Sequence, residues 1–263
     1  TTVTPNGALF RIDKQGFLPE LLEEMYDQRV LFKTKMIEEQ KRLETIPKDD
    51  LVARKECEYS IVKYHNNQMV RKISLNSCYG ALGNQYFRYF NREIAEGITT
   101  SGQLSIKWVE KAVNNYLNKL LDTEDDYVIA IDTDSIYVRF DELVNKVNPK
   151  NPVDFLDTIA KEKFEPMINS NYEELASYTN AYENKMEMGR EVIADKGIWT
   201  AKKRYILNVH DSEGVRYKTP KLKIMGIETA KSSTPMWCRK KLTEGIRTLM
   251  TGTEDDVHDF ILN

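Results

Sequence analysis

Two long stretches with helical periodicity, separated by a short polar turn, constrain the fold of this chain more than any other feature of its sequence. The first begins near Pro19, which is followed by acidic residues that favour the positive end of a helix dipole, and its apolar residues recur at helical spacing to Leu43. Pro47 and the three charged residues after it interrupt the pattern, and a second helical stretch runs from about Leu51 to Tyr79. Two long helices joined by so short a turn are predicted to form an antiparallel hairpin.

The composition is typical of a globular protein. With 263 residues the chain exceeds a typical single domain, so we expect one large unit or two to three smaller ones. Hydrophobic residues make up 41% and charged residues 30%, and no apolar run approaches the roughly 18 residues of a membrane span, so no membrane association is expected. The three cysteines lie far apart without CxxC spacing, which argues against a disulfide framework or a zinc site and favours a reducing cytoplasm.

The net charge of -3 conceals two tracts of opposite sign. From Lys196 to Lys231 there are nine basic and three acidic residues, whereas from Asp122 to Glu142 there are eight acidic residues and one basic residue, Arg139. An acidic tract suits divalent cations and a basic tract suits phosphate groups. The alternative is that both tracts are ordinary solvated charge, and composition alone favours this alternative.

The rest of the chain alternates between strand-like and helical patterns. Strands are expected in a hairpin within residues 1–18 and at 127–131, 136–138, 203–209 and 215–227. Helices are expected at 92–121, 153–187 and 235–262.

Asp132 and Asp134 form the first group of residues with catalytic potential, in the tight turn predicted between two strands. Such a turn projects carboxylates from a sheet edge, where Mg²⁺ binds through one or two of them and completes its shell with phosphate oxygens. The alternative is that aspartate simply favours turns. An EF-hand does not fit, because Ile136 and Tyr137 stand where further ligands and a glycine would be needed.

The second group lies on the predicted helical hairpin. Arg29 and Lys33 are four residues apart, as are Lys72 and Asn76, so each pair shares one helix face. Tyr79 follows Asn76 by about one helical turn. Packed antiparallel, the helices would present three cations and an amide to one polyanion such as a triphosphate, with an aromatic ring for stacking. The alternative is the charged outer face of a solvated helical arm.

The third group is the run Lys202-Lys203-Arg204-Tyr205, which opens a predicted strand. Strand alternation would send Lys203 and Tyr205 to one side, and Lys202 and Arg204 to the other. The functional interpretation is sequence-independent contact with a nucleic-acid backbone. The alternative is a basic strand edge that discourages aggregation.

In their order along the chain, these groups resemble the motifs of family B DNA polymerases. The run from Lys72 to Gly80 resembles the family's Kx3NSxYG motif, residues 132–135 its DTDS motif, and residues 202–205 its KKRY element. The surrounding sequence is most similar to the replicative polymerases of T-even-type bacteriophages. The resemblance covers essentially the whole chain.

The resemblance implies an α+β fold with three parts. Residues 1–15 and 85–226 would form a palm, with a mainly antiparallel sheet flanked by helices. Residues 16–84 would form the inserted helical hairpin, or fingers, and residues 227–263 the start of a helical thumb.

The resemblance also implies a role for each matched residue. Asp134 would be the metal-binding carboxylate, with Asp132 beside it, in a site that holds two Mg²⁺ ions when complete. Tyr79 would lie against the nascent base pair. The residues implied to hold the incoming dNTP are Arg29, Lys33, Lys72 and Asn76. Those implied to contact primer–template DNA are Lys202, Lys203, Arg204 and Tyr205.

One family motif, DxxSLYPS, does not occur in these 263 residues. It supplies the other catalytic aspartate in the family, so we expect this chain to be inactive alone, as one product of a split polymerase gene or as a truncated fragment. A second polypeptide with the exonuclease domain and the missing motif is the expected partner, together with a sliding clamp, in the cytoplasm of an infected host cell. The alternative is a non-catalytic nucleic-acid-binding subunit or an inert fragment.

Overall fold

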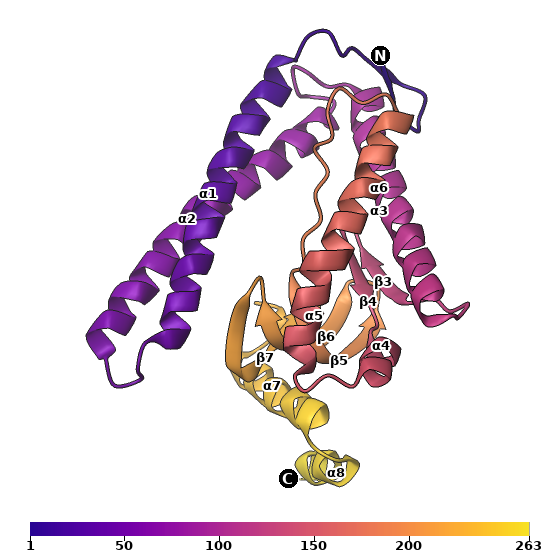
Figure 1. The fold of residues 1–263 in the computed structure, drawn as a ribbon. Helices are drawn as coiled ribbons and strands as arrows, with labels where there is room; N and C mark the ends of the chain where they lie inside the picture. Colours follow the sequence, from indigo (N-terminus) through magenta and orange to yellow (C-terminus); the bar gives the residue numbers. More distant parts are fainter. Residues whose placement is uncertain (263) are drawn as a thin grey trace. The chain divides into compact units, whose positions relative to one another are not determined.

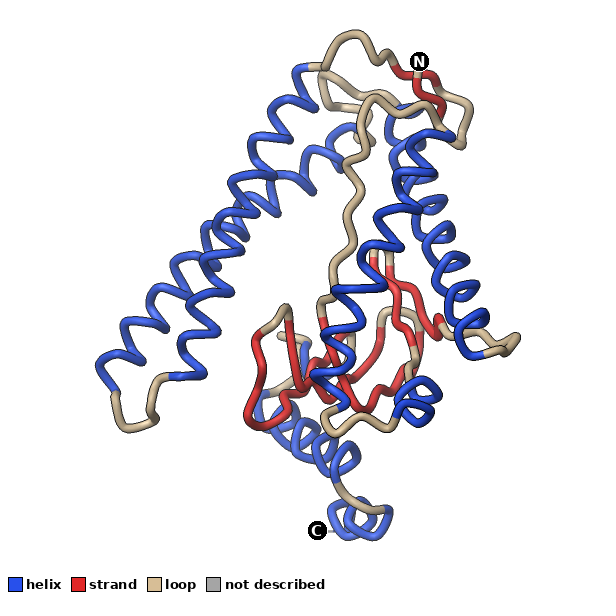
Figure 2. The backbone as a smooth tube through the Cα atoms, viewed as in Figure 1, coloured by secondary structure: helices blue, strands red, loops and turns tan. Residues whose placement is uncertain are grey.

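The structure is a computed structural model that describes residues 1–262, and the chain divides into two compact units. One unit comprises Thr1–Arg190 and the other begins at Glu191. The described residues combine helices with antiparallel sheets of two, two and three strands (Figures 1 and 2), which confirms the predicted α+β class. Within residues 1–262, no helix combines the length and the apolar character that crossing a membrane requires.

The first unit begins with a strand pair and a long helical hairpin, both as predicted (Figure 1). Strands β1 (Thr2–Val3) and β2 (Leu9–Phe10) pair antiparallel. Helices α1 (Phe17–Thr45) and α2 (Leu51–Leu82) form the hairpin. The first helix begins two residues earlier than expected, because Pro19 is tolerated within the first turn, where a backbone N–H has no partner in the helix.

Polar side chains help to hold α1 against α2. Cys57 is buried, and its thiol donates to the carbonyl oxygen of Glu39 at 3.1 Å. Burial, assisted by the Glu39 carboxylate, raises the pKa of Cys57 to about 11, so the thiol stays protonated as a donor. Near the turn, Arg54 donates to the carbonyl oxygens of Leu43 and Ile46 at 3.2 and 3.1 Å. These bonds hold the two helices together in the part of the hairpin nearest its turn.

The core of the first unit lies where helices α3 (Arg92–Leu121) and α6 (Glu165–Tyr178) pack with a β-hairpin. Its strands β3 (Val128–Asp132) and β4 (Ser135–Val138) pair antiparallel, as predicted, and α3 matches its predicted range. A short helix α4 (Asp141–Val147) follows; two turns are too few for periodicity to reveal. The buried side chains of this core include Val109, Val113, Leu117, Tyr127, Phe164 and Tyr172.

Two asparagines of α3 hold the loop that leads into β3. The side-chain oxygen of Asn114 accepts from the backbone N–H groups of Tyr127 and Val128, at 2.9 and 3.2 Å. One turn later, the Asn118 amide accepts from the N–H of Asp125 and donates to its carbonyl oxygen, both at 2.9 Å. The helix therefore determines where strand β3 begins.

The helix predicted at 153–187 is wrong in part. It ends at Tyr178, because Asn180 adopts a left-handed backbone with φ of 51°, a conformation that ends helices. It is also interrupted: α5 (Pro152–Ile159) is followed by a π-helical segment, Ala160–Phe164, before α6 begins.

The π-helical segment separates two sets of contacts. Before it, Asp157 pairs with Arg190, whose side chain is 10% exposed. At its end, the Phe164 ring packs edge-on against Tyr116 and Phe140, with centroids 5.3 and 5.1 Å apart. The wide turn therefore lies between a largely buried ion pair and the aromatic part of the core.

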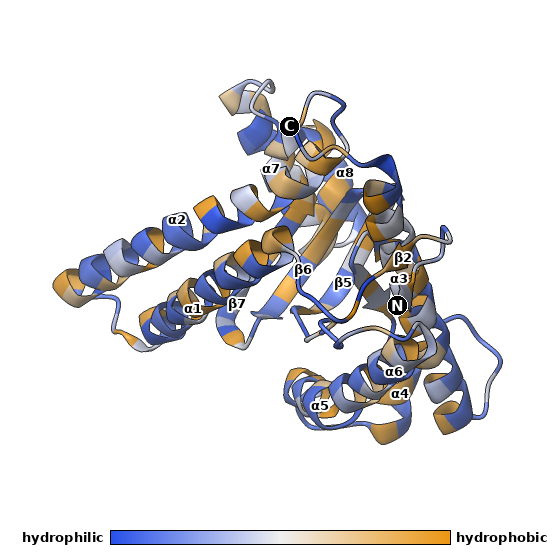
Figure 3. Cartoon of the chain, turned by 90° about the horizontal axis from the view of Figure 1, so that it is seen from above, coloured by the Kyte–Doolittle hydropathy of each residue, from blue (hydrophilic) through white to orange (hydrophobic). Residues whose placement is uncertain are grey.

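The second unit is built on a three-stranded antiparallel sheet. Strands β5 (Val192–Ala201), β6 (Arg204–Ser212) and β7 (Val215–Met225) follow one another in space as in sequence. The central strand β6 is mostly buried, and Figure 3 colours much of it hydrophobic. Strand β5 was not predicted, because the run Asp195–Gly197 breaks its apolar pattern. Strand β7 ends two residues before the predicted end.

The C-terminal helix predicted at 235–262 consists of two helices, α7 (Met236–Thr251) and α8 (Glu254–Leu262). A reciprocal cap separates them. The Thr253 N–H donates to the Asp256 carboxylate at 2.7 Å, and the Asp256 N–H donates to the Thr253 hydroxyl at 3.3 Å. Such a cap starts a new helix, although the apolar periodicity continues across it.

We predict that Gly226→Ala destabilises the second unit. Gly226 has a φ of 67°, and a Cβ atom there would lie 2.2 Å from the carbonyl oxygen of Lys203. The free energy of unfolding, measured by urea denaturation, should fall by about 1–3 kcal/mol. Gly102→Ala is the control, because a Cβ there meets no atom within 4 Å in the interior of α3. Gly102→Ala should raise the free energy of unfolding by about 0.5–1 kcal/mol. A Gly226→Ala protein as stable as the parent would contradict the close approach.

Candidate nucleotide- and metal-binding site

The carboxylates of Asp132 and Asp134 lie at a strained turn at the tip of the β3–β4 hairpin. Asp132 pairs with Ser135, so Thr133 and Asp134 make the turn. The Asp134 N–H donates to the Asp132 carbonyl oxygen at 2.7 Å across Thr133, whose φ is 61°. A β-branched residue is seldom found in this left-handed region, and backbone strain of this kind is concentrated at functional sites.

The two carboxylates at this turn are suitable ligands for a hard cation. Asp134 is exposed and Asp132 is half-buried. Burial raises the pKa of Tyr172 on α6, and the negative charge of Asp134 adds to the rise, so this neighbouring phenol stays protonated. Mg²⁺ uses one or two carboxylates and takes its other ligands from phosphate and water. Within residues 1–262, no three His, Cys, Asp or Glu side chains are grouped to hold a metal by themselves. The turn therefore fits an ion shared with a substrate or with other residues.

The helical hairpin places Arg29 and Lys72 on one flank. Gln28 on α1 faces Arg71 on α2, and the Arg71 Nε donates to Gln28 Oε1 at 2.9 Å. Each following residue is rotated by about 100° around its own helix. Because the helices are antiparallel, both rotations turn toward the same flank. Arg29 and Lys72 are therefore neighbours at nearly the same level of the hairpin.

Lys33 and Asn76 extend this flank in opposite directions, each one turn further along its own helix. From the Gln28–Arg71 contact, Asn76, Lys72, Arg29 and Lys33 form a row about 15 Å long in that order. Lys72 and Asn76 are exposed, and Arg29 is half-buried. The Nε of Arg29 is buried without an acceptor among residues 1–262. A buried donor is costly unless something supplies an acceptor, which an anionic ligand on this flank would do.

Tyr79 lies where α2 meets α3. Its hydroxyl is 3.0 Å from the hydroxyl of Thr99, and its side chain lines a pocket of about 320 Å³ together with Phe90 and Arg92. The residue remains 45% exposed. A ring held at its hydroxyl end, with part of its surface free, is suited to stacking.

The basic run of the second unit differs from its predicted arrangement. Strand pairing ends at Ala201 and Arg204, so Lys202 and Lys203 form a two-residue turn and the strand starts at Arg204. Lys203 has a φ of 62°. The predicted alternation therefore does not include the two lysines, whose side chains are exposed at the turn.

The last two residues of the run are engaged within the second unit. Arg204 pairs with both carboxylate oxygens of Glu228, at 2.6 and 2.7 Å. Tyr205 is 4% exposed, and its ring lies 6.2 Å from that of Trp199. Their contacts hold the base of the turn that presents the lysines.

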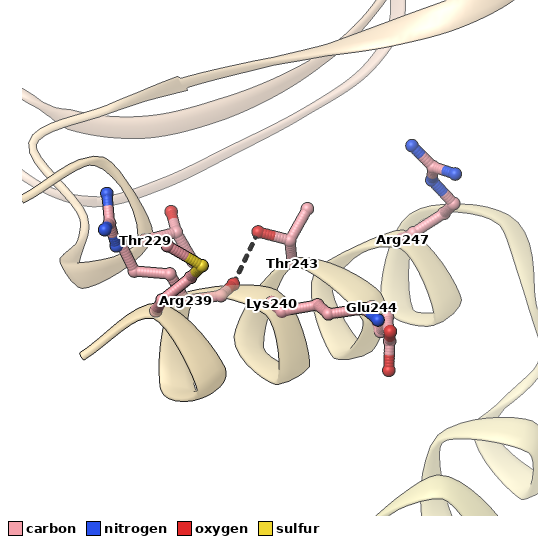
Figure 4. A pocket seen from close by; sticks show the side chains of 7 residues that line it. Thr229, Arg239, Lys240, Thr243, Glu244 and Arg247 are labelled. Carbon is pink, nitrogen blue, oxygen red and sulfur yellow. Dashed lines mark hydrogen bonds between the residues drawn. The ribbon is translucent and has the colours of Figure 1, made fainter. Parts of the chain in front are cut away.

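Sequence reasoning missed a second cationic surface in this unit. One face of α7 and Thr229, from a 3₁₀ turn at Glu228–Ala230, line an open pocket of about 560 Å³ (Figure 4). Its charged lining residues are Arg239, Lys240, Glu244 and Arg247. The signal in the sequence is the recurrence of Arg239, Thr243 and Arg247 at every fourth position, which places them on one helix face.

Comparison with known proteins gives consistent matches along the chain. The family model described as DNA polymerase family B matches residues 2–260. The chain is 36% identical over 310 aligned positions to the DNA-directed DNA polymerase of Enterobacteria phage T4, which covers 99% of this chain and 34% of that protein. It is 38% identical over 297 positions to the DNA-directed DNA polymerase of Escherichia phage RB69, covering 94% and 33%.

A more distant similarity is to DNA polymerase beta of African swine fever virus, at 26% identity over 242 positions, covering 89% of this chain and 19% of that protein. The chain spans about a third of the length of the two phage proteins.

We predict that Thr133→Gly stabilises the first unit by about 1 kcal/mol. Glycine has no Cβ penalty at a φ of 61°, and relief of that strain should exceed the added entropy of the unfolded chain. Urea denaturation measures the change. Ser135→Gly is the matched control, because it lies in strand β4, where glycine should cost about 0.5–1 kcal/mol. A Thr133→Gly protein less stable than its parent would show that the turn is not strained.

Proposed function

The chain belongs to DNA polymerase family B, and we propose that it supplies the fingers, most of the palm and the start of the thumb of a template-directed DNA polymerase. In this assignment residues 1–15 and 85–226 are palm, 16–84 fingers and 227–263 thumb. The observation that carries the proposal is that a carboxylate turn and a cationic helical flank belong to one compact unit, Thr1–Arg190. Nucleotidyl transfer needs both kinds of group.

The hairpin flank binds the dNTP in this proposal. Arg29, Lys33 and Lys72 contact phosphate oxygens, and Asn76 adds an amide donor. The buried Nε of Arg29 supports this role, since a phosphate oxygen would give it the acceptor that it lacks among residues 1–262. Tyr79 stacks against the nascent base pair with the part of its ring that remains exposed.

The turn at the tip of β3 and β4 is the proposed metal site. Asp134 holds Mg²⁺, with Asp132 as the adjacent ligand. Two bound Mg²⁺ ions would activate the primer 3′-hydroxyl and neutralise charge on the leaving pyrophosphate. The pairing of Asp132 with Ser135 fixes the position of the carboxylates in advance, so that little reorganisation accompanies the attack of the 3′-hydroxyl on the α-phosphate.

The exposed turn of the second unit is the proposed contact with primer–template DNA. Lys202 and Lys203 approach the phosphate backbone, where positive charge adds affinity without reading sequence. Arg204 and Tyr205 complete the proposed DNA-binding element. The burial of Tyr205 and the ion pair of Arg204 favour the two lysines as its contacting side chains.

In this proposal the remaining catalytic carboxylate comes from a polypeptide segment outside these 263 residues, because the DxxSLYPS motif does not occur within them. We propose that the β3–β4 pair receives the strand that carries it. Within residues 1–262 no further strand joins this pair, and Ile129 and Ile131 of β3 are 49% and 37% exposed. Unpaired edges and exposed apolar side chains invite an added strand.

Complementation tests this function. We predict no primer extension by the 263-residue chain alone, and extension when a polypeptide that carries the DxxSLYPS segment is added. Asp134→Ala in the complemented enzyme should lower the rate more than tenfold, because a metal ligand acts directly on the transition state. Asp141→Ala, which removes the same charge from an exposed aspartate in the first turn of α4, is the control and should leave the rate unchanged.

Extension by the isolated chain would mean that another carboxylate within it replaces the missing one. A complex that forms but does not extend primers would favour a non-catalytic nucleic-acid-binding subunit or an inert fragment. Retention of more than about a tenth of the rate by Asp134→Ala would remove that residue from the metal site.

We further predict that Lys203→Gln weakens primer–template binding equally for unrelated sequences and lowers the slope of log affinity against log salt by about 1. Lys218→Gln makes the same charge change at an exposed position of β7 and should leave the slope unaltered. Binding is measured by fluorescence anisotropy over a series of salt concentrations. A loss that depends on the DNA sequence would contradict the backbone contact.

A further inference from the structure

Arg71 lies between the two helices of the hairpin, outside the set of residues assigned to the nucleotide. Its Nε donates to Gln28 Oε1 at 2.9 Å, and one Nη donates to the carbonyl oxygen of Asn67 at 3.0 Å. Its guanidinium lies over the Phe32 ring, 4.6 Å from the centroid. Two of these contacts reach across from α2 to α1. Together they hold the guanidinium in one orientation.

The three groups named above, an amide oxygen, a backbone carbonyl and an aromatic ring, are all neutral. Arginine stays charged at physiological pH, and a charge placed in a helix seam loses hydration that neutral partners only partly restore. A methionine would pack against Phe32 without that cost. Apolar packing would also tolerate sliding of one helix past the other. The hydrogen bonds of Arg71 resist such sliding, because a hydrogen bond weakens steeply when its angle changes.

Gln28 and Arg71 immediately precede Arg29 and Lys72. We propose that Arg71 is a positioning residue for the triphosphate, because its contacts with Gln28 and Phe32 fix the spacing and register of Arg29 and Lys72. The inference rests on the proposed binding of a triphosphate by those two residues. A slip of one residue would move one helix by about 1.5 Å and rotate its cation by about 100°, away from the shared flank.

Gln28 tests whether the contacts of Arg71 across the helix seam affect triphosphate affinity. It carries no charge, and its side-chain oxygen accepts from Arg71. It therefore affects triphosphate affinity through the placement of Arg71 and of the helix seam. If Arg71 contacted phosphate directly, its charge would carry the affinity, and lysine would replace it in part.

The experiment titrates this chain with dATP by calorimetry, and separately with a primer–template duplex. The variants are Arg71→Met, Gln28→Met and their combination, because methionine has a helix propensity similar to both residues. We expect each single variant to weaken dATP binding by about tenfold, while DNA affinity changes by less than about twofold. The double variant should bind dATP no more weakly than Arg71→Met does, since both changes break the same contact between Arg71 and Gln28.

Two further variants separate positioning from loss of stability and from loss of charge. Cys57→Ala removes a buried side chain of the same seam, about 21 Å along α2 from Arg71, and leaves the Arg71 contacts beside Arg29 and Lys72 intact. It should therefore lower Tm without changing dATP affinity. Arg71→Lys keeps the charge but not the planar, stacked geometry, so it should bind dATP as weakly as Arg71→Met.

Unchanged dATP affinity in Gln28→Met overturns the positioning role, and so does equal weakening in Cys57→Ala. Parental affinity in Arg71→Lys overturns it too, because charge alone would then suffice. A parent chain that binds no dATP contradicts the nucleotide assignment of Arg29 and Lys72, and the positioning role with it. Failure of the inference alone is thus distinct from failure of the proposed function.

Discussion

The position of the Asp132–Asp134 turn depends on hydrogen bonds to the side-chain amide of Asn114. Its oxygen accepts from the backbone N–H groups of the adjacent residues Tyr127 and Val128. The amide is carried on the helix that supplies Val109 and Val113 to the core, so the start of β3 is fixed to the most buried part of the unit. Side chains alternate along a strand, and a shift of one residue at its start would turn the terminal aspartate to the other face. The placement of the carboxylates is therefore decided at the opposite end of their strand.

The helical hairpin is stabilised differently from the core. Few apolar residues are buried in its seam, and within α1 only Met36 is buried. Thiol, amide and guanidinium groups make hydrogen bonds between its helices. An apolar seam adapts to small shifts, whereas hydrogen bonds favour one register. The cationic flank and the polar seam therefore depend on each other, because cations on different helices share one flank only while that register is kept.

The sequence predicts those parts of the fold in which local pattern and burial agree. Both hairpin helices, α3 and the β3–β4 pair have regular periodicity and clear ends, and the structure has them close to their predicted bounds. Strand β5 is not predicted, because the polar run Asp195–Gly197 is extended only through its pairing with β6. Local sequence does not reveal that pairing. The turn at Lys202 and Lys203 depends likewise on the close approach of Gly226. For the site, spacing indicates which residues share a helix face, but the role of Arg71 becomes visible only when the two helices are seen in contact.

The π-helical segment has a consequence for how this region tolerates insertions and deletions. A π-turn takes in one residue more than an α-helical turn, so the residues on its two sides are out of phase by about 100°. Asp157 is directed to Arg190 in one phase, and Phe164 to Tyr116 and Phe140 in the other. Loss of a single residue between them would restore an unbroken helix and bring both sides into one phase. Either the ion pair or the aromatic contact would then be lost, so the length of this segment is constrained more strictly than the identity of its residues.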